Sequence, residues 1–271
     1  MEGFKRLFSL QFIKRPMLIG MVHIRPLPGT PLNRGVSLNQ IEKQALKETE
    51  LLAKHDFDAL IVENMFDIPY IQNVGPEIIA SMTKLCSEIR SNFPKSKPVG
   101  VQILAGENQS ALAVALASGL QFIRAEAFVY GHVADEGWMD AQAGELLRYR
   151  KNINAEHISI FTDIKKKHSA HQITSDVSIG ETASAASFFL SDGLIVTGSS
   201  TGAQANPNDL SEVIKATPNL PVLIGSGITP ENAKNFEKAH GFIVGSYLKQ
   251  NGNWNQEMDE DRLKNMAQTI K

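Results

Sequence analysis

Residues 157–165, His-Ile-Ser-Ile-Phe-Thr-Asp-Ile-Lys, alternate between aliphatic and mixed side chains and finish on charged groups. Successive side chains of an extended strand point to opposite faces. The two faces carry Ile158, Ile160 and Ile164 on one side, and Ser159, Phe161, Asp163 and Lys165 on the other. In a barrel, helices cover the outer face of the sheet and make it apolar. The stretch therefore predicts a barrel strand with Asp163 and Lys165 directed inward at its carboxyl end.

Seven further short runs rich in apolar or β-branched residues surround this one. The eight runs cover residues 17–23, 58–63, 98–104, 120–126, 157–163, 193–197, 221–225 and 241–245. The segments between them have helical periodicity, and no hairpin-length turn joins two adjacent runs. This alternation is typical of parallel strands connected by crossover helices.

Capping signals mark where the connecting helices begin. Ser37 with Gln40 forms a capping-box pattern, and Asn206-Pro207 and Thr229-Pro230 pair an N-cap side chain with a first-turn proline. Pro76 suits another first turn. Asp259, followed by two more acids, suits the positive end of a last helix.

The alternation of strands and helices predicts a fold of the α/β class. Eight strand–helix units in 271 residues favour a single closed (β/α)₈ barrel, a TIM barrel. An open nucleotide-binding sheet is disfavoured because no GxGxxG turn follows the first strand. Without a Pro-, Gly- or Ser-rich linker, residues 17–271 are predicted to form one barrel domain, preceded by an amphipathic helix over residues 1–16.

Composition excludes several classes of function. A net charge of −2 and no dense basic stripe argue against nucleic acid as a partner. The single Cys86 cannot form an internal disulfide. No run of about 20 apolar residues predicts a transmembrane segment.

The first 16 residues allow two interpretations. Phe4, Leu7, Phe8 and Phe12 share one helical face, and four basic residues outnumber Glu2. A short helix packed across the end of the fold is favoured, because only Pro16 separates it from the first strand. The same pattern is found in mitochondrial presequences. We therefore expect a cytoplasmic protein, with mitochondrial targeting as the alternative.

Polar side chains gather at the predicted strand ends, where active sites of this fold lie. They are His23, Glu63, Gln102, Arg124, Glu126, Asp163, Lys165, Lys167, Thr197 and Ser226. Charges inside a barrel must be paired, so the ionic members could simply neutralise one another. Polar ends on so many strands favour a ligand site instead.

Glycines end the last three strands. The segments are Thr197-Gly198-Ser199, Gly225-Ser226-Gly227 and Gly245-Ser246. Loops after strands seven and eight commonly bind phosphate in this fold, because glycine lets backbone N–H groups approach an anion closely. The alternative is that these glycines only form tight turns. Residues 128–139 form a longer loop that suits either a lid over the mouth or a surface excursion.

Several longer motifs resemble the BtpA/SgcQ family across nearly the whole chain. They include Ile-Gly-Met-Val-His at 19–23, Pro-Leu-Pro-Gly at 26–29, Val-Glu-Asn at 62–64, Val-Gly-Pro-Glu at 74–77, Arg-Ala-Glu at 124–126, Asp-Ile-Lys-Lys-Lys-His at 163–168 and Gly-Ser-Gly-Ile-Thr-Pro-Glu-Asn at 225–232. The resemblance implies a TIM barrel of the ribulose-phosphate-binding type with no settled reaction and a short helix before the first strand. One cyanobacterial member is needed to accumulate photosystem I. The chain departs from some bacterial members at Gln102, where asparagine is expected.

The resulting hypothesis is an isomerase or lyase acting on a small phosphorylated metabolite, either a sugar phosphate or a nucleotide-like compound. Asp163 or Glu126 would act as general base, Lys165 as electrophile or Schiff-base nucleophile, and His23 and Glu63 would orient or protonate. The predicted substrate-binding residues are Gln102, Arg124, Lys167, Thr197, Gly198, Gly225, Ser226, Gly227, Gly245 and Ser246.

Two alternatives accompany this hypothesis. Mg²⁺ or Mn²⁺ would suit oxygen-rich ligands among His23, Glu63, Glu126, Asp163 and His168, although no ligand pair has a diagnostic spacing, so no metal site is assigned. A non-enzymatic assembly factor peripheral to a membrane complex is the competing function, because a fold does not determine a function. Assembly of the chain into a homo-oligomer is also allowed.

Overall fold

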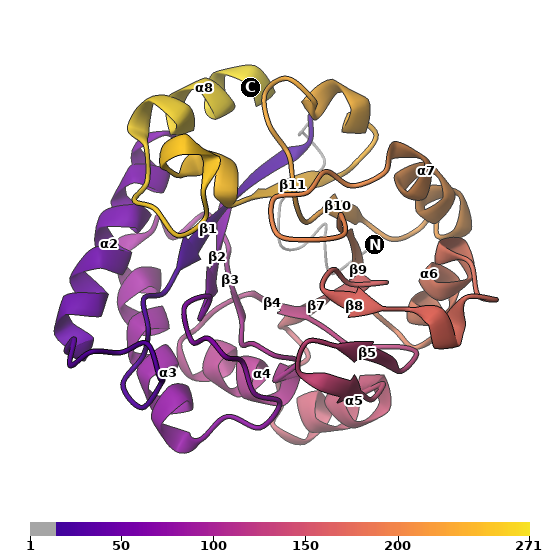
Figure 1. The fold of residues 1–271 in the computed structure, drawn as a ribbon, viewed down its shortest axis with the longest axis horizontal. Helices are drawn as coiled ribbons and strands as arrows, with labels where there is room; N and C mark the ends of the chain where they lie inside the picture. Colours follow the sequence, from indigo (N-terminus) through magenta and orange to yellow (C-terminus); the bar gives the residue numbers. More distant parts are fainter. Residues whose placement is uncertain (1–14) are drawn as a thin grey trace.

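The computed structural model describes residues 15–271, whose eight main strands close into a parallel barrel (Figure 1). In chain order these strands are β1 (Met17–His23), β2 (Ala59–Glu63), β3 (Val99–Gln102), β4 (Phe122–Ala125), β7 (Ser159–Ile164), β9 (Gly193–Val196), β10 (Val222–Ile224) and β11 (Gly241–Val244). Pairing of β1 with both β2 and β11 closes the ring. The predicted (β/α)₈ fold is confirmed. The helix predicted over residues 1–16 lies outside the described residues except for Arg15 and Pro16.

Seven α-helices surround the described part of the barrel. They are α2 (Leu38–Lys54), α3 (Pro76–Asn92), α4 (Asn108–Ala117), α5 (Ala143–Asn152), α6 (Ile179–Phe188), α7 (Pro207–Ala216) and α8 (Glu260–Ile270). The predicted capping box of Ser37 and Gln40 is confirmed, and Asn206 and Asp259 cap α7 and α8. These caps fix the ends of the crossovers and hence the strand ends.

The helix predicted to begin at Thr229-Pro230 does not form. A four-residue 3₁₀-helix, η2 (Ala233–Phe236), takes its place. The Asn232 side chain accepts a hydrogen bond from the Thr229 N–H and donates to the Gly227 carbonyl. These bonds close the segment after β10 as a turn, so this crossover contains the 3₁₀-helix in place of an α-helix.

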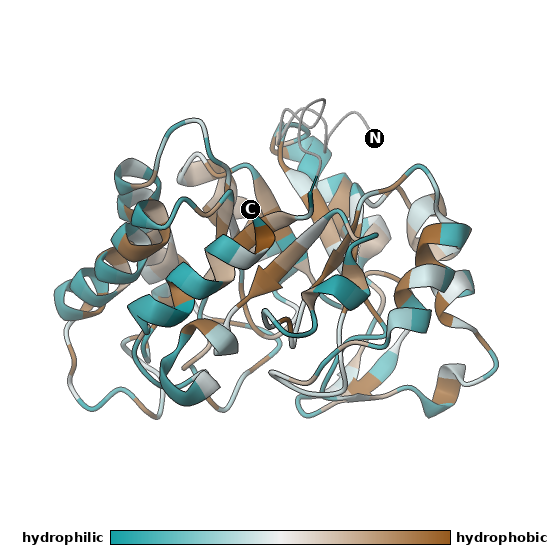
Figure 2. Ribbon diagram, turned by 90° about the horizontal axis from the view of Figure 1, so that it is seen from above, coloured by the Kyte–Doolittle hydropathy of each residue, from teal (hydrophilic) through white to brown (hydrophobic). Residues whose placement is uncertain are grey.

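The hydrophobic core has two layers. One lies between strands and helices, and the other fills the base of the barrel interior with residues such as Ile19, Ile61 and Ile243. The Phe122 and Phe161 rings meet edge-to-face inside, with 5.8 Å between centroids. Figure 2 shows hydrophobic strands at the centre and hydrophilic outer helix faces. The plug at the base leaves the upper interior for polar side chains.

The long loop over residues 128–139 contains a β-hairpin. Its strands β5 (His132–Ala134) and β6 (Gly137–Met139) are antiparallel, and β5 also pairs with β8 (Ser169–Ala170). β8 follows the loop after β7. The hairpin is therefore attached to the segment that carries three consecutive lysines, residues 165–167.

Candidate functional site

Three predicted polar residues lie side by side at the mouth. Strand pairing places His23 of β1 beside Glu63 of β2, and Glu63 beside Gln102 of β3. His23 Nε2 and Glu63 Oε2 are 3.7 Å apart. All three side chains are buried, and His23 Nδ1 and Gln102 Oε1 have no hydrogen-bond partner among residues 15–271. Such buried, unpaired atoms are rare unless something outside the chain satisfies them.

Arg124 and Asp163 form a buried ion pair across β4 and β7. Arg124 Nε and Nη2 donate to the two Asp163 carboxylate oxygens at 3.0 and 2.8 Å. Burial alone would lower the pKa of Arg124, but the charge and hydrogen bonds of Asp163 raise it. Mutual neutralisation therefore holds for this pair. Both Asp163 oxygens are engaged, which leaves this carboxylate poorly placed as a free general base.

Two other mouth carboxyls have raised pKa values. Burial is the main cause for both Glu63 and Glu126, opposed by Lys167 at Glu63 and by Lys166 at Glu126. Glu126 Oε2 accepts a hydrogen bond from the Gly106 N–H at 3.1 Å. The Asn108 side chain bonds both the N–H and the carbonyl of Glu126 and so fixes this residue at the end of β4.

Lys167, rather than Lys165, lies in the mouth. β7 ends at Ile164, and Lys165 has a φ of +45°, so the strand alternation that predicted an inward Lys165 no longer applies. Lys165 Nζ donates to the Thr174 carbonyl at 3.3 Å, in a separate recess. Lys167 shares a recess with Glu63 and Arg124. Burial, followed by the charge of Arg124, lowers the pKa of Lys167.

His23 is a neutral histidine at physiological pH. Burial, followed by the charge of Lys249, lowers its pKa to about 3. An imidazole in this state offers one donor and one acceptor. His168 was a further candidate, but it lies near the rim, where its Nδ1 is 3.8 Å from Asp135 Oδ2.

The glycine loops pack tightly against one another at two positions. A Cβ added at Gly198 or Gly227 would lie 2.4 or 2.3 Å from the Ala203 carbonyl oxygen, so both positions need glycine for backbone packing. The Ser226 hydroxyl accepts a hydrogen bond from the Gly198 N–H and donates one to the Ala203 carbonyl oxygen. These two bonds join the loops, so this hydroxyl has a structural role. Gly225 leaves room for Ile195 and Arg124, since a Cβ there would lie 2.4 Å from Ile195 Cγ2 and 3.1 Å from Arg124 Nη2.

The remaining loop positions line an open recess. Gly202, Gly227, Gly245 and Ser246 border a space of about 110 Å³ that Arg262 of α8 also reaches. Arg262 donates Nε–H to the Tyr247 carbonyl, and its guanidinium lies 4.2 Å from the centre of the Tyr247 ring. Thr197 directly follows β9, and its buried Oγ1 has no hydrogen-bond partner among the described residues.

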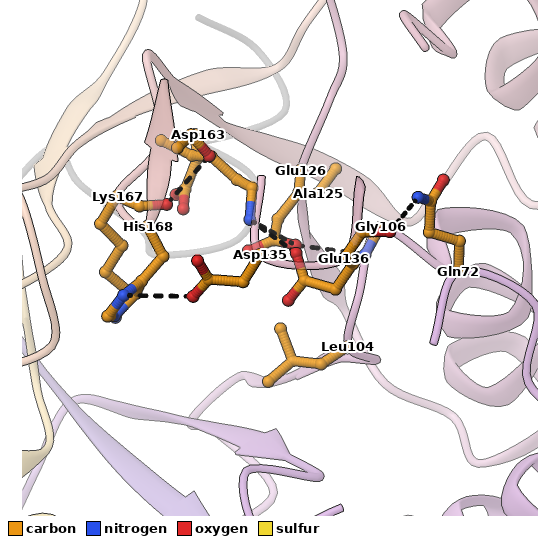
Figure 3. Close-up of polar contacts among 12 residues, drawn as sticks. Gln72, Leu104, Gly106, Ala125, Glu126, Asp135, Glu136, Asp163, Lys167 and His168 are labelled. Atoms are coloured by element: carbon orange, nitrogen blue, oxygen red, sulfur yellow. Dashed lines mark hydrogen bonds and ion pairs between the residues drawn. The ribbon is translucent and has the colours of Figure 1, made fainter. Parts of the chain in front are cut away.

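The hairpin adds residues that the sequence did not indicate. Lys166 Nζ lies 3.7 Å from Glu126 Oε2 and 3.8 Å from Glu136 Oε2, between the end of β4 and the hairpin. Gln72 Nε2 donates to the Glu136 carbonyl at 2.9 Å. Figure 3 shows Asp135 and Glu136 near His168 and Glu126 at this rim. No local motif predicts these contacts, because they join segments about 30 to 60 residues apart in the chain.

The proposed metal ligands do not converge. Within the part of the chain that the structure describes, no group of three or more His, Cys, Asp or Glu side chains is arranged to hold a metal ion. Asp163 is bound by Arg124, and His168 lies near the rim.

Comparison with known proteins places the chain in a family. The model of the BtpA family matches residues 14–271. The chain belongs to the BtpA family. A Caenorhabditis elegans relative, named as an uncharacterized mitochondrial protein, is 51% identical over 92% of this chain and 91% of its own length. The photosystem I biogenesis protein BtpA of Synechocystis is 34% identical, over 91% and 85%.

Solved structures support the barrel fold of this BtpA-family chain. N-(5'-phosphoribosyl)anthranilate isomerase from Pyrococcus furiosus aligns with a TM-score of 0.57 at 15% identity, over 94% of this chain and 98% of that one. Orotidine 5'-monophosphate decarboxylase from Methanocaldococcus jannaschii aligns with a TM-score of 0.57 at 14% identity, over 94% and 98%. In residues 15–271, no helix has the length and apolarity needed to cross a membrane.

Proposed function

We propose that this protein is an enzyme that transfers a proton on a small phosphorylated metabolite, as an isomerase or lyase does. The observation that supports this most is that Glu63, Arg124 and Lys167 border the same recess as Gly227 and Gly245. Acid–base side chains and an anion-binding backbone would then contact one ligand from two sides. The barrel enzymes described above have names that refer to phosphorylated compounds, which agrees with this proposal.

The phosphate would bind at the 110 Å³ recess beside Ser246. The backbone of Gly202, Gly227, Gly245 and Ser246 borders this recess. Gly202 and Gly245 leave the backbone accessible. Arg262, held by Tyr247, would supply the positive charge that the predicted glycine loops lacked.

Lys167 and Glu63 would carry out the proton transfer. The raised pKa of Glu63 and the lowered pKa of Lys167 bring both groups closer to neutral pH, where acid–base catalysts are most effective. Lys167 replaces Lys165 in the predicted role of electrophile or Schiff-base nucleophile. Glu126 is the remaining candidate base, and Asp163 would position Arg124. Neutral His23 would orient a substrate oxygen.

A thermal-shift screen tests the phosphate site. Inorganic phosphate and ribose 5-phosphate, with and without Mg²⁺, should raise the melting temperature of the wild type. Ser246→Asp should abolish the shift by charge repulsion, and Ser246→Ala should largely retain it. An equivalent charge change at Gly227, another residue of this recess, is unsuitable, because Gly227→Asp would collide with Ala203 and disturb the fold. Equal shifts in wild type and Ser246→Asp would contradict the proposal.

The name of the Synechocystis relative favours a second candidate, an assembly factor without catalysis. Under this alternative, Lys167→Met would fully rescue a strain that lacks the protein. Under the enzyme proposal, rescue fails although the variant folds.

The cytoplasmic assignment remains our proposal, with mitochondrial import as the alternative suggested by residues 1–16 and by the name of the worm relative. Full-length protein and a variant with Lys5, Arg6, Lys14 and Arg15 changed to Gln, each fused to a fluorescent protein, distinguish the two. Mitochondrial fluorescence that depends on these basic residues would replace the cytoplasmic assignment.

A further inference from the structure

A second, larger cavity of about 490 Å³ adjoins the recess that Glu63, Arg124 and Lys167 border, and it shares Glu63, Met65, Lys167 and Thr201 with that recess. The same recess shares Gly202, Gly227, Gly245 and Ser246 with the proposed phosphate site on its other side. A ligand that reaches Lys167 from the glycine loops would therefore continue into this cavity. Volumes of about 300–1,000 Å³ are typical for drug-sized ligands, so the cavity has room for much more than a pentose phosphate.

One wall of the cavity is apolar and aromatic. Met65, Leu104 and Ala105 form a hydrophobic cluster separate from both core layers, and Tyr70 and Trp254 pack against it. The Tyr70 hydroxyl donates to the Met65 carbonyl at 2.7 Å, which fixes the ring. Trp254 lies against Phe66, with 5.0 Å between ring centroids. Rigid aromatic rings beside a cavity provide a surface on which a planar group can stack.

The cavity is also lined by a buried carboxylate with a free oxygen. The Glu136 side chain is 8% exposed and lines the cavity. Its Oε2 atom has no hydrogen-bond partner among the described residues, and the nearest cation, Lys166 Nζ, is 3.8 Å away. A buried carboxylate oxygen is costly to leave unpaired, so an N–H donor from a ligand would satisfy it. The Gln72 hydrogen bond holds the hairpin that presents this group (Figure 3).

We propose that the cavity binds a planar nitrogen heterocycle carried by the phosphorylated sugar, so that the substrate is a nucleotide-like compound. This inference rests on the proposed phosphate site. The heterocycle would pack on Tyr70 and Trp254 and donate an N–H to Glu136. The sugar would then lie beside Glu63 and Lys167, between the cavity and the glycine loops.

The test compares affinities measured by calorimetry for ribose 5-phosphate, the adenosine, cytidine, guanosine and uridine 5′-monophosphates, and the matching nucleosides. At least one monophosphate should bind about tenfold or more tightly than ribose 5-phosphate, because stacking on aromatic rings adds affinity. The chain has two tryptophans, Trp138 and Trp254. A Trp138→Phe variant therefore keeps Trp254 as its single tryptophan, and the fluorescence of Trp254 should change when the monophosphate binds. Trp138 does not line the cavity.

Two variants separate the cavity from the phosphate site. Glu136→Met and Trp254→Leu should each reduce the preference for the monophosphate by about fivefold or more while ribose 5-phosphate binds as before. Glu145→Gln, at an exposed carboxylate of α5, is the matched control and should keep the preference.

Three outcomes of these titrations distinguish the heterocycle inference from the proposed phosphate site. Equal affinity for ribose 5-phosphate and every monophosphate would overturn the heterocycle inference and leave the proposed function standing. Nucleoside binding without any gain from the phosphate would support the cavity and contradict the phosphate site. No binding of any of these compounds would contradict both.

Discussion

At the residue scale, the mouth separates charges that are bound to each other from groups left open. Arg124 and Asp163 satisfy one another in the interior, which makes this pair part of the scaffold. Replacing one partner of such a pair leaves a buried charge alone and usually costs about 3–5 kcal/mol. Glu63, Lys167 and His23 lack comparable partners, and their altered pKa values identify them as candidates for function.

His23 makes stability sensitive to acid. Its pKa falls from 6.5 to about 3 on folding, so between these values the unfolded chain binds a proton that the folded chain does not. Stability is therefore lost as pH falls through this window. At pH 4.5 the loss due to His23 is about 3 kcal/mol relative to pH 7.5.

Urea unfolding of wild type and His23→Gln at both pH values measures this contribution. The variant should lose about 3 kcal/mol less on acidification, while His132, whose pKa is lowered to about 4, contributes equally to both proteins. His157→Gln, at an exposed histidine, should behave as wild type. Equal acid-dependent losses in wild type and His23→Gln would show that His23 is not held neutral.

At the element scale, loops hold one another and so shape the site. Ser226 links the loop after β10 to the loop after β9, because its hydroxyl bonds both Gly198 and Ala203. Asn64 has a similar place in the other half of the mouth, where its side chain bonds the Leu104 N–H and the Asp67 carboxylate. Asn64 follows β2 directly and Ser226 lies two residues beyond the end of β10, so the barrel positions both residues and they position the loops.

Removing the Ser226 hydroxyl should loosen the loop over residues 197–204. Ser226→Ala leaves the Gly198 N–H and the Ala203 carbonyl without this partner, at a cost of about 1–3 kcal/mol. Hydrogen exchange followed by mass spectrometry should show faster exchange in this loop than in the wild type. Ser246→Ala serves as the control, since the Ser246 side chain makes no such link. Unchanged protection in Ser226→Ala would exclude a structural role for the hydroxyl.

Sequence reasoning worked best where a signal is local and periodic. Strand alternation predicted the inward position of Asp163, because the 2-residue period holds within a strand. It was wrong for Lys165, one residue beyond the end of β7, where a left-handed backbone breaks the period. The pattern at Thr229-Pro230 resembles a helix start but forms a turn, since Asn232 provides competing hydrogen bonds.

Contacts between loops on different sides of the mouth could not be predicted from local sequence patterns. Glu136, Tyr70 and Trp254 reach one cavity from three segments far apart in the chain, and none carries a motif. Arg262 comes from the last helix, where its charge resembles that of any solvent-facing residue. Only the closed barrel, which brings the ends of all its strands together, places these residues around one space.

At the scale of the whole molecule, the two ends of the barrel differ: the base contributes hydrophobic stability, and the mouth carries the candidate functional groups. Apolar residues fill the base, and unpaired polar atoms, glycine loops and a hairpin occupy the mouth. The near-neutral net charge of −2 conceals this arrangement. We propose that this mouth binds a phosphorylated metabolite beside Lys167.

The most direct test is a calorimetric titration of wild type, Lys167→Met and Lys165→Met with ribose 5-phosphate and the nucleoside monophosphate that binds wild type most tightly. The two lysines are two positions apart, yet only Lys167 borders the recess with Glu63 and Gly227. We expect Lys165→Met to bind both compounds like wild type and Lys167→Met to bind them at least about tenfold more weakly. Equal losses in the two variants, or a loss confined to Lys165→Met, would contradict it.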